Sequence, residues 1–164
     1  MANRVTSDRA TSDRASVEPK VVLDAHRLLD QAAAMADDGD LVAGTAERFR
    51  VYYLAALRTA GAALVVLESR RRPPRGERNA WTRLVAQAGF VRDDRGLGEH
   101  ARYFAGHSVL RQRIENGLVD EVEQAIVARM RVRLSEFLAE TEAILADYEQ
   151  GREVLGGAAA RRSA

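Results

Sequence analysis

The segment from residue 41 to residue 70 limits the possible architectures more than any other part of the sequence. Its apolar residues follow helical spacing, and one face of the predicted helix carries Phe49, Tyr53, Ala56, Ala60, Ala63, Leu64 and Leu67. Further apolar side chains lie elsewhere around the helix, at Val51, Leu54, Val65 and Val66. A helix that is apolar on more than one side needs neighbours on more than one side, so this one belongs in the middle of a bundle.

The segment before it is also helical in pattern. Pro19 stands near the first turn, and the stripe of apolar or small residues is Val21, Ala25, Leu28, Ala32 and Met35. The polar run "DDGD" at 37–40 is expected to end this helix. We therefore interpret Asp37 and Asp38 as turn residues rather than metal ligands.

Two shorter helices are predicted after the loop "RRRPPRGER" at 70–78, whose two prolines and glycine interrupt helical structure. Asn79 is the predicted N-cap of the first, "AWTRLVAQA", which Gly89 closes. The polar turn "RDDRG", with Asp93 and Asp94, leads to the second, from about 97 to 116, which Gly117 closes.

The longest helix follows and begins with a capping-box pattern, Asp120 and Glu123. Its predicted buried stripe is Val122, Ile126, Met130, Leu134, Phe137, Leu138, Leu145 and Tyr148. No segment alternates in the manner of a β-strand, so the predicted fold class is all-α.

The two ends of the chain lack this periodicity. Residues 1–17 contain the tandem repeat "TSDRA TSDRA" and are predicted to be a disordered leader. Residues 18–150 form the predicted helical domain, and residues 151–164 a flexible C-terminal tail. A chain of 164 residues is enough for one domain with a real core.

Composition excludes several classes of protein. The chain has no cysteine, which excludes disulfide frameworks, thiolate nucleophiles and cysteine zinc sites. The longest mostly apolar run, "AGAALVVL", is far shorter than the roughly 20 residues of a membrane span, so we expect a cytoplasmic protein without a membrane. A net charge of +1 gives no global case for nucleic-acid binding, and an RNA partner would need a local basic patch. The motifs HExxH, Gly-x4-Gly-Lys and Gly-x-Ser-x-Gly are absent, and we expect no metal and no cofactor.

Several stretches together resemble a known family: "AERFRVYYLAALRTAGAALVVLESR", then "AWTRLV" and "YFAGHSVLRQRIENGL", and finally "VDEVEQAIVARM" and "FLAETEAIL". The combination is similar to the HEPN superfamily (higher eukaryotes and prokaryotes nucleotide-binding), in a small single-domain branch found mainly in actinobacteria, over about residues 20 to 150. The resemblance implies an antiparallel bundle of four to five helices, often paired as a homodimer or docked on a partner protein.

Catalytically active HEPN proteins are metal-independent endoribonucleases marked by an Arg and, four to six residues later, a His. The resemblance implies that this His acts as acid and base on the ribose 2′-hydroxyl or the leaving oxygen, while the Arg stabilises charge on the phosphorus oxygens. Arg102 and His107 fit the motif as "R-YFAG-H", and Arg95 and His100 fit it as "R-GLGE-H". Where the commoner pattern has a polar residue after the Arg, this chain has Tyr103.

Helical geometry separates the first pair. Residues five apart on an ideal helix point about 140° away from each other, so Arg102 and His107 converge only across a partner subunit or through a distorted turn. With Phe104 packed inward, we expect His107 to flank the core and Arg102 to point to solvent or to a second subunit.

Other candidate residues have simpler interpretations. Trp81 is predicted to anchor the core, His100 to be exposed near a helix start, and His26 to have no role because no acidic partner stands at useful spacing. The best candidates for contact with RNA phosphates are the arginines around the loop, Arg70, Arg71, Arg72, Arg75 and Arg78.

Two functional hypotheses follow from this sequence. The first is a HEPN-like helical interaction module that forms a homodimer or binds a protein partner, in an RNA- or nucleotide-related system of the toxin-antitoxin or defence kind. The alternative is a metal-independent endoribonuclease that uses the Arg102 and His107 pair.

Overall fold

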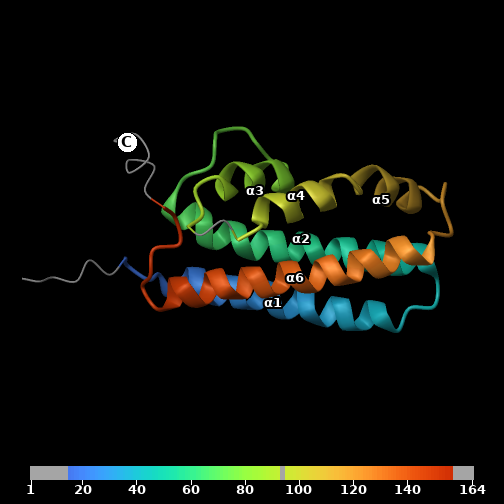
Figure 1. Ribbon diagram of the computed structural model, residues 1–164, viewed down its shortest axis with the longest axis horizontal. Helices are drawn as coiled ribbons and strands as arrows, with labels where there is room; N and C mark the ends of the chain where they lie inside the picture. The colour runs from blue at the N-terminus through green and yellow to red at the C-terminus, as the bar shows by residue number, and fades with distance from the viewer. Residues whose placement is uncertain (1–14, 93–94, 157–164) are drawn as a thin grey trace, which may run out of the picture.

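The computed structural model describes residues 15–92 and 95–156, and this part of the chain contains six helices (Figure 1). They are α1 (Pro19–Asp40), α2 (Thr45–Arg70), α3 (Ala80–Ala88), α4 (Leu97–Ala105), α5 (Ser108–Glu115) and α6 (Gln124–Glu149). The three long helices α1, α2 and α6 run side by side, and the short helices α3, α4 and α5 follow one another along α2 (Figure 1). The predicted all-α bundle is confirmed.

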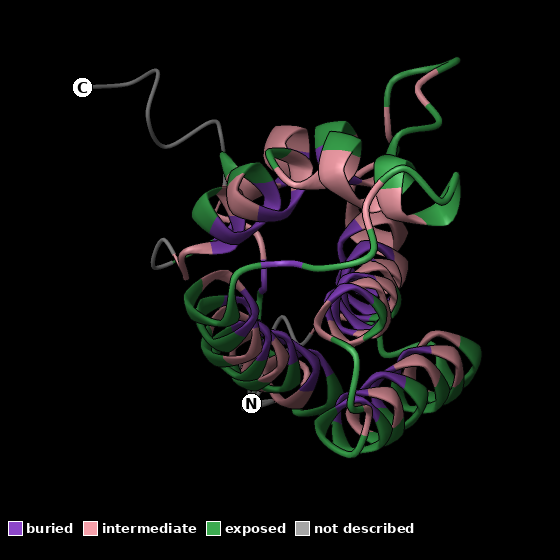
Figure 2. Ribbon diagram, turned by 90° about the vertical axis from the view of Figure 1, so that its right-hand side faces the viewer, coloured by how far each residue is buried: buried purple, intermediate pink, exposed green. Residues whose placement is uncertain are grey.

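Helix α2 is the centre of the bundle, as its apolar residues predicted. It packs against α1, α3, α4, α5 and α6, and 13 of its residues are buried. Figure 2 shows the buried residues on the sides of the helices that face one another. By length and composition α2 would also be long and apolar enough to cross a membrane, but 61% of its apolar 18-residue window is buried inside the bundle, which is typical of the core helix of a soluble domain.

Aromatic residues hold the short helices onto the long ones. The Trp81 ring of α3 stacks on Phe104 of α4 with centroids 5.6 Å apart, and it lies 6.4 Å from Phe137 of α6. Its indole Nε1–H donates a hydrogen bond of 2.8 Å to the Tyr53 hydroxyl of α2. Trp81 is buried, so the prediction that it anchors the core is confirmed.

The single helix predicted over residues 97–116 is divided in two. Gly106 is the C-cap of α4 and His107 is the N-cap of α5, with the His107 N–H donating to the Phe104 carbonyl three residues back. This tighter turn breaks the α-helical ladder. If α4 and α5 are counted as one interrupted helix, the described part of the bundle has five.

The predicted starts of α2 and α6 were wrong, whereas α1 does end with the run "DDGD". Helix α1 continues through "DDGD" to Asp40, so Asp37 and Asp38 lie in its last turn, and α2 begins only at Thr45. Helix α6 begins at Gln124, and its N-cap Glu123 makes no side-chain capping bond. Instead of a capping box, the chain before α6 is fixed from outside by a 2.9 Å bond from the Val122 N–H to the Thr45 hydroxyl.

The chain after α6 docks on the bundle as far as it is described. Val154 is buried, the Arg92 N–H donates to its carbonyl at 3.0 Å, and Leu155 forms an antiparallel bridge with Val91. Residues 151–156 therefore pack against the domain, although the sequence placed them in the tail. Residues 157–164 of that tail, and 1–14 of the predicted leader, lie outside the described residues.

Candidate functional site

Arg102 lies on the α3 side of α4. Its side chain is exposed, and its Nη1 atom is 3.2 Å from the position that a Cβ on Gly98 would occupy. Together with Gly98, Gly89 and Val85 it lines an open pocket between α3 and α4. The guanidinium group is therefore turned back along its own helix toward α3.

His107 lies in different surroundings. Its half-buried ring is edge-on to Phe49 of α2, with centroids 5.6 Å apart, and to Tyr103, at 4.8 Å. Burial lowers the pKa of His107 below its usual 6.5, so the ring is neutral at neutral pH. His107 flanks the core and Arg102 points outward, as the helical geometry predicted, and within one chain the two side chains do not share a site.

The second pair that fits the motif, Arg95 and His100, contacts residues of α6. Arg95 forms an ion pair with Asp147 of α6, in which both side chains are mostly shielded from solvent. His100 is only 5% exposed and stacks on Phe137 with centroids 5.3 Å apart, so the prediction that it is exposed was wrong. Burial is the main reason that the pKa of His100 is lowered from 6.5. The cause is helical spacing, because His100 shares the inward face of α4 with Leu97, Ala101 and Phe104.

Helix α6 brings two arginines to the α4 residues, and the resulting set is named the α4–α6 cluster: His100, Tyr103, His107, Arg129 and Arg133. The Arg133 guanidinium carbon lies 5.2 Å from the centroid of the Tyr103 ring. Burial raises the pKa of Tyr103, and the positive charges of Arg129 and Arg133 offset part of that rise. The Tyr103 hydroxyl and the His100 Nδ1 atom are both buried with no hydrogen-bond partner among the described residues.

Sequence reasoning missed Arg129 and Arg133. The available signal was their separation of four residues beside the predicted buried stripe, which places both on one side of a helix. That spacing does not show which other helix they face. Only the packing of α4 on α6 brings them to Tyr103.

The arginines around the 70–78 loop divide into two groups. The Arg70 guanidinium lies 4.4 Å from the centroid of the Tyr148 ring, and that of Arg71 lies 3.8 Å from the Phe90 ring, so both are packed against aromatic residues. Arg72, Arg75 and Arg78 are exposed. Of the five predicted phosphate contacts, these last three remain on the open surface.

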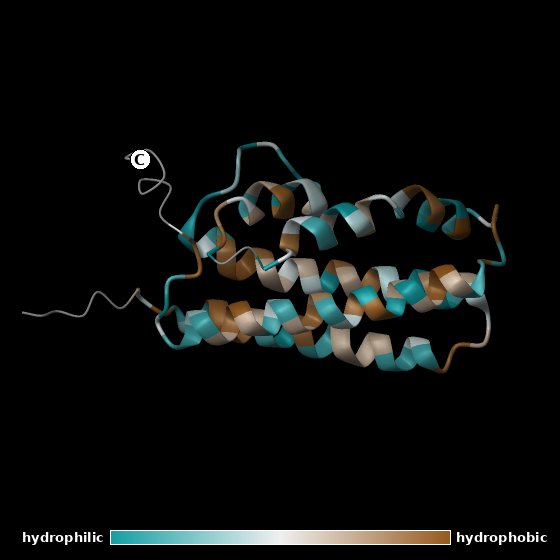
Figure 3. Cartoon of the chain, viewed as in Figure 1, coloured by the Kyte–Doolittle hydropathy of each residue, from teal (hydrophilic) through white to brown (hydrophobic). Residues whose placement is uncertain are grey.

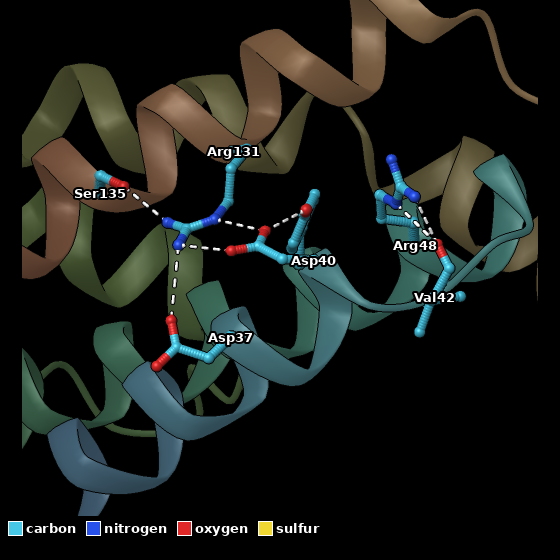
Figure 4. Close-up of polar contacts among 7 residues, drawn as sticks. Asp37, Asp40, Val42, Arg48, Arg131 and Ser135 are labelled. Carbon is cyan, nitrogen blue, oxygen red and sulfur yellow. Dashed lines mark hydrogen bonds and ion pairs between the residues drawn. The ribbon is translucent and has the colours of Figure 1, made fainter.

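A third group of charges joins α1, α2 and α6, and is named the Asp40 corner: Asp37, Asp40, Tyr52, Arg131 and Ser135 (Figure 4). The Asp40 carboxylate accepts hydrogen bonds from Arg131 Nε at 2.8 Å, from Arg131 Nη2 at 3.0 Å and from the Tyr52 hydroxyl at 2.5 Å. Arg131 Nη1 donates to Ser135 at 2.6 Å. The bonds from Arg131 are the main reason that the pKa of Asp40 is lowered, and burial together with Asp40 raises the pKa of Tyr52 to about 12.

His26 does have an acidic partner, although none was evident from sequence spacing. Its Nε2 atom contacts a carboxylate oxygen of Glu149, 123 residues away at the end of α6, on an exposed face. Among the described residues, no three His, Asp or Glu side chains gather in a way that would hold a metal ion.

Comparison with known proteins places the chain in a family. Searches of curated proteins and of solved structures found no match. Residues 40–142, from the end of α1 to the middle of α6, match the sequence profile of the SAV_6107-like HEPN family. This match covers more than half of the 164 residues and includes both α2 and the α4–α6 cluster, so the chain belongs to the SAV_6107-like HEPN family.

Proposed function

We propose that this HEPN domain is a cytoplasmic interaction module, which forms a homodimer or binds a protein partner and does not cleave RNA with Arg102 and His107. The proposal rests on the different surroundings of these two side chains. Arg102 is directed to the pocket beside Gly98, whereas His107 packs against Phe49 and Tyr103. A metal-free cut needs the acid/base group and the charge-stabilising group at the same phosphate.

The surface of α5 and α6 supports association with another protein. Helix α5 has no buried residue, and the helix on which it packs is α2. Large apolar side chains are exposed on these elements, with Val109 of α5 at 66%, Leu118 after α5 at 68% and Val132 of α6 at 57%. Apolar side chains exposed in this way favour burial against a partner.

The oligomeric state tests this proposal. We expect light scattering after size-exclusion chromatography to show a dimer of the full chain, or a stable complex with a partner purified from the native cell. Val109→Arg and Val132→Arg should shift the dimer to monomer, whereas Leu23→Arg, at an equally exposed position on α1, should not. A chain that stays monomeric at high concentration and retains no partner would contradict the proposal.

The endoribonuclease remains the alternative, in an RNA-related system of the toxin-antitoxin or defence kind. One observation favours it: the lowered pKa of His107 leaves a neutral imidazole that can accept a proton. It requires Arg102 from a second subunit to reach His107. Purified protein should be incubated with RNA and EDTA beside His107→Ala and Arg102→Ala. Cleavage that both substitutions abolish would establish the enzyme and refute the proposed non-catalytic role.

A further inference from the structure

The α4–α6 cluster contains charges and donors that the bundle does not use. Arg129 and Arg133 have no ion pair or hydrogen bond with any residue that the structure describes, whereas Arg131 between them is fully engaged in the Asp40 corner. The hydroxyl of Tyr103 is buried and has no hydrogen-bond partner in the described part of the chain, and the same holds for Nδ1 of His100. A buried polar atom without a partner costs stability, so two such atoms beside two arginines that form no ion pair among the described residues indicate a site for a ligand.

The donors lie in register along two helices. His100 stacks on Phe137, Tyr103 lies under Arg133, and His107 lies one turn further along the chain with its ring edge-on to Tyr103. Arg129 and Arg133 are one turn apart on α6 and both act on the Tyr103 hydroxyl. The acidic residues that act on this group, Glu99, Glu136 and Glu140, lie around His100. Positive charge is therefore concentrated at the end of the cluster formed by Tyr103, His107, Arg129 and Arg133.

The geometry points to an oxyanion-binding site for a phosphate group, formed by Arg129 and Arg133 of α6 with Tyr103 and His107 of the α4–α5 break. The two guanidinium groups supply the charge and the phenol supplies a neutral donor. In the proposed site the long Arg133 side chain, whose guanidinium lies over the Tyr103 ring, turns away from that ring so that the hydroxyl can donate to the ligand. None of these four residues is Arg102, so the site differs from the pair that the sequence motif suggests.

The arrangement of donors favours phosphate over a carboxylate. A carboxylate is planar and is satisfied by the fork of one arginine. Here the donors come from two positions on one helix and from a second helix, which suits a tetrahedral group with several acceptor oxygens. The edge-on contacts of His107 with Phe49 and Tyr103 hold its imidazole at the rim of the site.

Titration of the full-length, ¹⁵N-labelled chain with inorganic phosphate at low salt tests the site. We expect saturable shifts of the backbone amides at residues 100–107 and 129–133. Arg129→Gln and Arg133→Gln should each weaken binding by roughly tenfold, since each removes a charge-assisted hydrogen bond. Tyr103→Phe keeps the charge and should weaken binding less, and unchanged circular dichroism shows that each variant is folded.

Arg102→Gln is the matched control, because it removes the same charge from the other side of α4. Its phosphate affinity should stay within about twofold of the wild type if local geometry rather than net charge drives binding. Equal weakening by Arg102→Gln and Arg133→Gln would overturn the proposal. So would the absence of saturable shifts with every probe.

The source of the phosphate is resolved by two further probes, a nucleoside monophosphate and a short single-stranded RNA. Tighter binding of the monophosphate, lost in Arg133→Gln, assigns the site to a free nucleotide. Tighter binding of the RNA, also lost in that variant, assigns it to a phosphodiester. Probes that bind wild type and Arg133→Gln equally overturn the site. Light scattering on the same samples separates this result from the proposed association, because a monomer that binds phosphate refutes only the latter.

Discussion

Three arginines at alternate positions of α6 have different environments. The contrast distinguishes an arginine whose charge is used within the bundle from two whose charge is not. Arg131 faces α1 in the Asp40 corner, where Asp40, Asp37 and Ser135 take up its guanidinium group. Arg129 and Arg133 face α4, where both act on Tyr103 and Arg133 also acts on His100. Arginine on one side of α6 thus stabilises the bundle through ion pairs, whereas the arginines on the side of α4 form no ion pair with any described residue.

The two regions also differ in how completely their polar atoms are used. In the Asp40 corner the tyrosine hydroxyl donates to a carboxylate, whereas in the α4–α6 cluster the tyrosine hydroxyl is buried without a partner. Hydropathy alone does not distinguish them, since hydrophilic and hydrophobic residues are mixed along the whole of α6 (Figure 3). The difference lies in the available acceptor, because Asp40 of α1 accepts from Tyr52, whereas no described residue accepts from the Tyr103 hydroxyl.

The largest expected effect is at Gly39, which packs tightly against Tyr52 of the Asp40 corner. A Cβ on Gly39 would lie 2.7 Å from Cε1 of the buried Tyr52 ring and 3.1 Å from Val51. We expect Gly39→Ala to lower the free energy of unfolding by about 1–3 kcal/mol, as overpacking does. Gly61→Ala is the control, because its Cβ would meet Leu28 at an ordinary 3.5 Å and should be neutral or slightly stabilising. Urea denaturation of the two variants checks this, and equal stability would contradict the close packing.

The next largest effect on stability is expected at Arg131, and the same substitution at Arg133 provides the comparison. Arg131→Met should lower the free energy of unfolding by about 1 kcal/mol, because Asp40 loses two hydrogen bonds on a partly exposed surface. Arg133→Met should change it by about 0.5 kcal/mol or less, since only a contact with an aromatic face is lost. Chemical denaturation measures both. A loss at Arg133 as large as that at Arg131 would mean that the α4–α6 cluster is structural.

Much of this fold was predictable from the sequence, because it depends on local periodicity. The central place of α2, the burial of Trp81 and the N-cap at Asn79 all follow from residues close together in the chain. The start of α6 at Gln124 was missed because a partner distant in sequence fixes the chain before it, as Thr45 does for Val122. No local spacing contains that information.

The candidate site was less predictable for the same reason. The motif drew attention to Arg102 and His107, and helical geometry correctly separated them. His100 was misjudged because its position near a helix start suggested exposure, while the inward face of α4 was decisive. Arg129 and Arg133 could have been paired by spacing, but only the tertiary contact of α4 with α6 gives them Tyr103 as a neighbour.

A smaller effect is expected at the two tyrosines. Tyr52→Phe removes a donor from Asp40 and should cost about 1 kcal/mol, whereas Tyr103→Phe removes a buried hydroxyl without a partner and should be neutral or stabilising by a few tenths of a kcal/mol. Thermal denaturation at one pH compares them. If the stability of Tyr103→Phe also falls, its hydroxyl has a partner that the bundle supplies, and the proposed phosphate site loses its neutral donor.

The smallest effect is a pH dependence that arises in the α4–α6 cluster. The folded-state pKa of His100 lies below the 6.5 of the unfolded chain, with burial as the main cause and the charge of Arg133 adding to it. Between these two pKa values the unfolded state binds more protons, so this residue contributes stability that is complete above about pH 6.5 and declines as the pH falls through the window. His100→Gln, which does not titrate, should therefore lose less stability than the wild type between about pH 7.5 and pH 5.

The nearby carboxylates Glu99, Glu136 and Glu140 raise the pKa of His100 and narrow the pH window, but they are present in both proteins. The difference between the two proteins in the free energy of unfolding, followed as a function of pH, therefore reports the titration of His100 alone. Parallel curves would show that His100 has the same pKa folded and unfolded, and hence that the α4–α6 cluster is open to water rather than shielded by α6.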